Sequence, residues 1–146
     1  MIPDSYHIRS SNFPVTQEDI DECVNPGTYG KSLVDYLQQN LELLGYEIPF
    51  TVAEDFGWWI EIKTDLGVST SIIVCRSNED EDEADFGIAL DYKDKKWSWR
   101  KCKKIDVKLF KEKLSLDLQK ILANEDKIKI VAFNLEEYGE IAEQGI

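Results

Sequence analysis

The spacing of apolar residues divides the chain into helical and extended segments. A first helix is predicted from an apolar stripe at helical spacing, made of Leu33, Val34, Leu37, Leu41 and Leu44. Gly45 is expected to end this helix with a positive φ, and Pro49 prevents it from resuming. A second helix is predicted with Asp106 as its N-cap and a buried stripe of Phe110, Leu114, Leu118, Ile121 and Leu122.

Residues 50–92 change to a period of two, which is typical of strands. Trp58, Ile60 and Ile62 share one face of the first strand, and Trp59, Glu61 and Lys63 share the other. Two further strands are expected at 69–76 and 86–92, and residues 95–99 extend this meander to a fourth. The N-terminal segment "SYHIRS" predicts an edge strand, "KIKIVAF" a last strand, and "LEEYGEIAEQ" a terminal helix.

Together these elements predict an α+β fold in a single globular domain, residues 1–146. We expect an antiparallel sheet of four to six strands with the two main helices packed on one face, because each helix has one apolar stripe to bury. Residues 12–30 read as a loop with a helical turn around Gln17–Cys23.

The charge is negative overall and unevenly distributed. The net charge is −12, whereas residues 93–113 hold ten Lys or Arg and three Asp or Glu, a local +7. The other residues therefore carry −19 (−12 minus 7). This balance favours basic partners and disfavours nucleic acid and anionic lipid. Three cysteines without close pairing indicate a reducing compartment, and no leader or membrane-length apolar run is present, so we expect a cytoplasmic protein. We further expect a bacterial protein that is a monomer or weak homodimer.

The stretch "EDFGWW" is the first candidate site. Gly57 early in a strand predicts a bulge or a close backbone approach. In the functional interpretation, Glu54 and Asp55 are polar anchors at the rim of an aromatic patch. In the structural alternative, Trp58 lies in the core over the first helix and Asp55 caps a turn. Trp59 faces the other side of the strand and is the better candidate for a contact with a partner.

A helix that ends in glycine and leads to a Glu-Asp-aromatic-Gly-Trp signature resembles small uncharacterised bacterial proteins. The resemblance covers about residues 29–62. It implies a shared scaffold around Glu54, Asp55, Gly57 and Trp58, and it implies no activity.

The second candidate is an acidic loop with six carboxylates within seven residues: Glu79, Asp80, Glu81, Asp82, Glu83 and Asp85. No register gives the glycine and glutamate that an EF-hand loop needs, so we predict no dedicated metal site. A solvated loop, a weak divalent-cation site and a surface facing a basic partner all remain open. Lys or Arg on a partner would relieve the mutual repulsion of these carboxylates.

The third candidate is the basic segment "KKWSWRKCKK". In an extended conformation Trp97 and Trp99 would face the same side, as a stacking platform for single-stranded nucleic acid requires. The residues of this alternative nucleic-acid-binding site are Lys95, Lys96, Trp97, Trp99, Arg100 and Lys101. In the structural alternative the tryptophans pack on the sheet and the lysines flank them in water.

Catalytic patterns are weak. The only histidine, His7, is expected near a mobile chain end, and no nucleophile elbow or phosphate-binding loop is present. Neighbouring lysines would favour a thiolate at Cys102, although a plain cysteine is the simpler interpretation. Glu54 and Asp55 could act as an acid–base pair only if burial raised the pKa of one of them.

The sequence therefore favours a non-enzymatic acidic protein-binding domain without a cofactor. Its most specific form is an immunity-type inhibitor of a basic bacterial toxin, such as a nuclease, whose carboxylates imitate phosphates. The alternatives are a single-stranded nucleic-acid-binding protein and an enzyme based on carboxylates.

Overall fold

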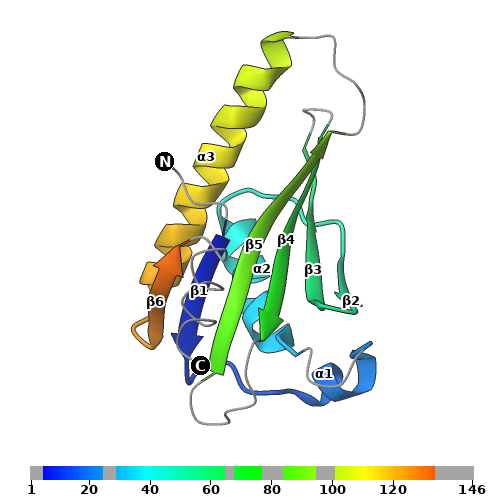
Figure 1. The fold of residues 1–146 in the computed structure, drawn as a ribbon, viewed down its shortest axis with the longest axis vertical. Helices are drawn as coiled ribbons and strands as arrows, with labels where there is room; N and C mark the ends of the chain where they lie inside the picture. Colours follow the sequence, from blue (N-terminus) through cyan, green and yellow to red (C-terminus); the bar gives the residue numbers. More distant parts are fainter. Residues whose placement is uncertain (1–4, 25–28, 65–67, 77–83, 95–100, 134–146) are drawn as a thin grey trace, which may run out of the picture.

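A computed structural model describes residues 5–24, 29–64, 68–76, 84–94 and 101–133 of the chain. The elements are, in order, β1 (Ser5–Ser10), α1 (Gln17–Glu22), α2 (Lys31–Leu43), β2 (Thr51–Glu54), β3 (Gly57–Ile62), β4 (Val68–Arg76), β5 (Ala84–Asp94), α3 (Lys101–Ala123) and β6 (Ile128–Phe133). Figure 1 shows one sheet with α2 and α3 behind it and α1 at its lower end.

The sheet has six antiparallel strands in the order β2-β3-β4-β5-β1-β6. The meander predicted for residues 50–92 is present, and β2 adds a strand that the pattern did not separate from β3. The fourth strand expected at residues 95–99 lies outside the described residues.

The expectation that the N-terminal strand lies at an edge is wrong. β1 is an interior strand between β5 and β6. The side chains of the adjacent residues Tyr6 and His7 point to opposite faces of the sheet, and both are almost completely buried. β1 is therefore covered on both faces. The Tyr6 hydroxyl also donates a hydrogen bond to the backbone carbonyl of Ser115 in α3 at 3.2 Å. The alternation of apolar and polar residues in "SYHIRS" predicted an edge strand, because these long-range partners are not visible in the sequence.

Both main helices pack their apolar stripe against the same sheet face and contact each other. Leu44 is the exception, since it lies just past the end of α2 and is 48% exposed. The α+β class with two long helices on one face is therefore confirmed (Figure 1). The core joins helix residues to strand residues, and its fully buried members include Leu33, Leu37, Leu41, Trp58, Ile60, Ile72, Val74, Ile88, Leu114 and Leu118. The helical turn predicted at Gln17–Cys23 is α1.

The predicted end of the first helix is confirmed, and the predicted start of the second is wrong. Gly45 has φ +95°, and its N–H donates to the carbonyl of Glu42 at 3.0 Å, which closes α2. Helix α3 begins at Lys101, so Asp106 lies inside the helix and is not its N-cap. Three of the five residues between Lys101 and Ile105 are lysines, which are good helix formers. They extend the helix by about one turn before Asp106.

Candidate functional site

The "EDFGWW" stretch forms the tip of the β2–β3 hairpin. Glu54 pairs with Gly57, and Asp55 and Phe56 make the turn between them. Gly57 has φ +149°, and a Cβ at this position would lie 2.3 Å from the carbonyl oxygen of Val74. Any side chain would therefore collide with the backbone of β4. The close backbone approach predicted at Gly57 is confirmed, and it sets the hairpin tip tightly against β4.

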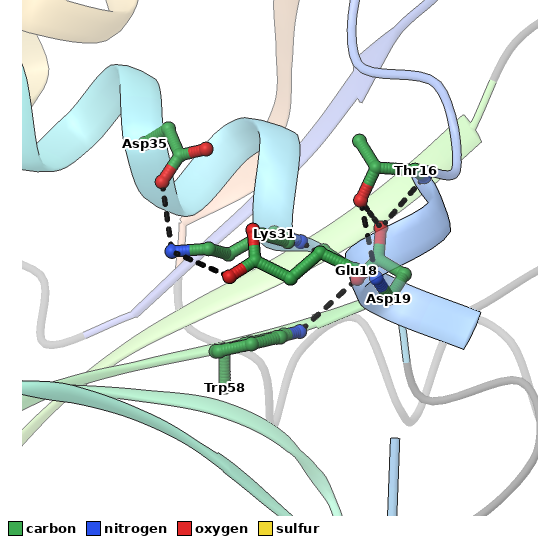
Figure 2. Close-up of polar contacts among 7 residues, drawn as sticks. Thr16, Glu18, Asp19, Lys31, Asp35 and Trp58 are labelled. Carbon is green, nitrogen blue, oxygen red and sulfur yellow. Dashed lines mark hydrogen bonds and ion pairs between the residues drawn. The ribbon is translucent and has the colours of Figure 1, made fainter. Parts of the chain in front are cut away.

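Trp58 points into the core, as the structural alternative predicted. Its side chain packs with the stripe of α2 and is 1% exposed. The indole nitrogen donates a hydrogen bond to Oδ1 of Asp19 in α1 at 3.1 Å (Figure 2). Trp58 is therefore a scaffold residue and is not available to a partner.

Asp19 is a buried carboxylate that links three elements (Figure 2). Besides Trp58, its Oδ1 accepts the backbone N–H groups of Gly30 at 3.0 Å and Lys31 at 2.9 Å, at the start of α2. Its Oδ2 accepts the N–H and hydroxyl of Thr16 at 3.1 and 3.3 Å. A carboxylate at a helix N-terminus satisfies N–H groups that have no partner within the helix. Sequence reasoning missed Asp19, although Thr-x-x-Asp is a capping-box pattern that marks the start of α1.

Lys31 neutralises the acidic side chains around this junction. Its ammonium lies 2.9 Å from Oδ1 of Asp35, 4.0 Å from Oε1 of Glu18, and 5.2 Å from the centre of the Trp58 ring. Figure 2 shows the lysine between the two carboxylates, above the indole. The junction of α1, α2 and β3 is thus satisfied internally, and we assign it a structural role.

Trp59 lies on the other face of the hairpin, as predicted. It is half-buried, and its indole nitrogen donates to Oε2 of Glu61 at 2.8 Å. Val52 stands opposite Trp59 in the β2–β3 register, and the Phe56 ring centre lies 6.5 Å from that of Trp59. Phe50 lies next to Glu61, since the Glu61 N–H donates to the Phe50 carbonyl at 3.1 Å. Val52 and Phe56 are thus direct neighbours of Trp59, and Phe50 lies at the far end of the same hairpin.

We call this surface the hairpin patch: Phe50, Val52, Phe56 and Trp59, with Glu54, Asp55 and Glu61 around them. Phe50 is 50% exposed, and Val52 and Phe56 are each 39% exposed. Asp55 is exposed, and Glu54 and Glu61 are half-buried. The structure thus brings three of the predicted partner-binding residues, Glu54, Asp55 and Trp59, together on one hairpin.

Asp85 does not join this patch. It lies in β5, which β4 separates from the hairpin, and it is 9% exposed. Its Oδ1 accepts a hydrogen bond from Nε of Arg9 at 2.8 Å and lies 3.2 Å from Nε2 of His7. Asp85 is opposite Arg9 in the β1–β5 register, which explains this pairing. The other acidic-loop residues, Glu79, Asp80, Glu81, Asp82 and Glu83, lie outside the described residues.

His7 lies in the interior of the sheet and is 1% exposed, so the expectation of a mobile position is wrong. Burial lowers the pKa of His7 below its ordinary value of 6.5, against the opposing effect of the Asp85 carboxylate. Burial also raises the pKa of the Cys75 thiol, which disfavours a reactive thiolate there. The side chain of Cys102 lies outside the described part of the chain.

The basic segment is only partly described. Lys95, Lys96, Trp97, Trp99 and Arg100 lie outside the described residues, and Lys101 is the first residue of α3, with its side chain likewise outside the description. From Lys101 onward the backbone is helical and not extended. The nucleic-acid-binding alternative therefore stays a prediction.

A cluster of Tyr46, Lys113 and Asp117 links the loop after α2 to α3, and sequence reasoning did not anticipate it. The Tyr46 hydroxyl donates to Oδ2 of Asp117 at 2.6 Å, and Nζ of Lys113 lies 3.0 Å from the same oxygen. The ammonium also lies 4.5 Å from the centre of the Tyr46 ring. An open cavity of about 300 Å³ adjoins the cluster, with Lys63, Phe110 and Lys113 among its lining residues.

The ionisation of this cluster follows from its geometry. Burial raises the pKa of Tyr46 above its ordinary value of 10, and the neighbouring Asp117 carboxylate acts in the same direction. For Asp117, burial alone would raise the pKa, but hydrogen bonds from Tyr46 and Lys113 and the lysine charges outweigh it and lower the pKa. At neutral pH the Tyr46 phenol is therefore neutral and Asp117 is ionised, and Tyr46 and Lys113 both contact the Asp117 carboxylate.

Comparison with protein-family models, with curated proteins and with solved structures finds no match. Among the described residues, no group of three or more His, Cys, Asp or Glu side chains is arranged to hold a metal ion. Within the same ranges, no helix has the length and apolar character needed to cross a bilayer.

Proposed function

We propose that this chain is a non-enzymatic protein-binding domain and that the hairpin patch receives a basic protein. The observation that carries the proposal is the exposure of Phe50, Val52 and Phe56 side by side, next to the carboxylates of Glu54 and Asp55. Exposed apolar residues rimmed by charge are typical of protein interaction sites. A net charge of −12 makes a basic partner the favourable one, because its charge speeds encounter and orients docking.

The rigidity of the hairpin supports the same proposal. Gly57 brings the tip against β4, and Trp58 is fixed in the core by Asp19, so Trp59 is held on the outer face by a strand that cannot rotate. A surface that is already ordered loses little conformational entropy when it binds. The Trp59 indole combines a large apolar area with one polar group, which suits an interface anchor.

The most specific form of the proposal is an immunity-type inhibitor of a basic toxin. A nuclease exposes Lys and Arg that bind phosphate, and Glu54 and Asp55 would take the place of phosphates in its cleft. The compact size and negative charge of the chain fit this role.

Affinity capture tests the proposal. The purified chain is immobilised, exposed to bacterial lysate at low salt, and eluted with increasing salt. We expect a stoichiometric basic protein that elutes as salt screens the attraction, and whose nuclease activity falls when the chain is added back. Retention only of acidic proteins, or retention of basic proteins equally by a Glu54→Lys/Asp55→Lys variant, would contradict the proposal.

A further inference from the structure

The outer edge of β2 presents backbone hydrogen-bonding groups. β2 is the last strand in the sheet order, and Figure 1 shows it at the margin of the sheet. The N–H of Glu61 donates to the carbonyl of Phe50, so these two residues form a hydrogen-bonded pair. Hydrogen-bonded and non-hydrogen-bonded pairs alternate in antiparallel strands. The N–H and C=O groups of Thr51 and Ala53 therefore point away from β3, toward the outer edge.

This edge lacks features that proteins commonly use to block a further strand. Edge strands are often protected by proline, lysine or a bulge. The segment Thr51–Glu54 contains neither proline nor lysine, and it pairs with β3 residue by residue without a register shift. The preceding residues also follow β3, because Lys63 N–H donates to the Glu47 carbonyl at 2.9 Å. Between this contact and the Phe50–Glu61 pair the register shifts by one residue, and Pro49 lacks an N–H, so the edge open to a further strand is limited to β2 itself.

Side chains next to this edge define what a partner strand would carry. Val52 and Glu54 in β2, and Phe50 just before it, alternate along the chain and share the face of Trp59. An added strand would place its own alternate side chains beside them. Apolar side chains suit Phe50 and Val52, and a Lys or Arg suits Glu54 by charge.

We propose that the basic partner binds by adding an extended segment to the outer edge of β2, which pairs with no other strand among the described residues. For an antiparallel strand, the matching pattern is basic-x-apolar-x-apolar, since the residue opposite Glu54 comes first. The added strand forms main-chain hydrogen bonds with Thr51 and Ala53, and its side chains extend the hairpin patch. This inference rests on the proposed function and names the mode of binding.

Amide hydrogen exchange with a defined probe tests the inference. The probe is the peptide Ser-Lys-Thr-Val-Thr-Val-Ser, and the control is a peptide of the same composition with the order Val-Val-Thr-Lys-Thr-Ser-Ser. We expect the probe to slow exchange at Thr51 and Ala53 at least about tenfold at saturation. The amides of Val52 and Glu54, which already bond to β3, should change little. The control should give no protection.

The outcomes separate this inference from the proposed function. Chemical-shift changes at Val52 and Phe56 without protection of Thr51 and Ala53 would overturn strand addition and leave the hairpin patch as a docking surface. No binding of the probe would also overturn strand addition, whereas failure of the capture experiment would overturn the proposed function itself.

A substitution gives a second test once a basic protein has been captured. Ala53→Pro removes the outward N–H group and also fixes φ at this residue, and we expect it to weaken binding about tenfold. Ala53→Ser keeps the N–H and should bind as the original chain does. Equal binding by the two variants, with equal urea midpoints, would overturn the inference. If the proline variant does not fold, the exchange measurement decides.

Discussion

The indole of Trp58 and the carboxylate of Asp19 are 39 residues apart in sequence and joined by a 3.1 Å hydrogen bond in the core. Because of this contact, the two adjacent tryptophans have different roles. Trp58 anchors the hairpin inward, and Trp59 is thereby presented outward beside Val52 and Phe56. The candidate binding surface therefore depends on a buried polar junction on the opposite face of the sheet.

Replacing Asp19 should weaken the whole fold. Asp19→Ala leaves the buried N–H groups of Gly30 and Trp58 and the half-buried N–H of Lys31 without their acceptor, and we expect a loss of about 3 kcal/mol in unfolding free energy. Asp21→Ala, in the same short helix but exposed, is the matched control and should cost well under 1 kcal/mol, roughly the usual surface effect. Urea denaturation followed by tryptophan fluorescence measures both. Equal losses in the two variants would show that the Asp19 junction is not a principal support.

Two glycines should respond differently to the same substitution. Gly57→Ala places a methyl group 2.3 Å from the Val74 carbonyl oxygen, so β3 and β4 must separate, and we expect a loss of about 3 kcal/mol or more. Gly45→Ala has only the strain of its positive φ, because no atom lies within 4 Å of the added Cβ, and should cost about 1 kcal/mol. Thermal unfolding of the two variants gives the comparison. A smaller loss at Gly57 than at Gly45 would contradict the close approach of the hairpin tip to β4.

Acid should weaken the link between Tyr46 and α3. The pKa of Asp117 is lowered from 3.8 in the folded protein, so the stability it contributes is present above pH 3.8 and is lost as the pH falls through the lower folded value. Asp117→Asn should therefore flatten the decline of unfolding free energy in this acid range. Tyr46→Phe removes one of the hydrogen bonds and should flatten it partly. An unchanged acid decline in both variants would contradict the assigned cluster.

The titration of His7 can be observed directly, because it is the only histidine. Burial lowers its pKa, so the folded protein binds fewer protons than the unfolded chain below pH 6.5. Its contribution to stability is therefore complete above pH 6.5 and falls as the pH decreases toward the folded pKa. The Cε1–H proton signal in NMR should titrate with a midpoint below 6.5. A midpoint at or above 6.5 would show that the Asp85 carboxylate dominates over burial.

Local sequence patterns predicted most helices and strands. The features that they did not predict depend on contacts between residues far apart in sequence. The leucine stripe of α2 and the division of Trp58 and Trp59 between two faces follow from periodicity, and the end of α2 follows from the positive φ that Gly45 can adopt. The interior position of β1 depends on β5 and β6, which are more than seventy residues away in sequence, roughly half the chain. The same holds for Asp19, whose acceptor role requires α2 and β3 to fold around it.

In the candidate site, too, contacts between residues close in sequence could be predicted, and contacts between distant strands could not. Glu54, Asp55 and Trp59 could be placed together because they are neighbours in one hairpin. Asp85 was grouped with the acidic loop by its position in sequence, and its pairing with Arg9 and His7 became visible only from the strand register. Phe50 and Val52 could not be identified as surface residues from the sequence, because the sequence does not show that β2 is an edge strand.

The most direct measurement of the central claim is the affinity of the captured basic partner for matched surface variants. Phe56→Ser removes an exposed apolar side chain from the hairpin patch, and Leu116→Ser removes one of similar exposure, 49%, from α3. Isothermal titration calorimetry should give a dissociation constant at least about tenfold higher for Phe56→Ser and an unchanged value for Leu116→Ser. An equal or larger loss for Leu116→Ser would show that the partner binds elsewhere.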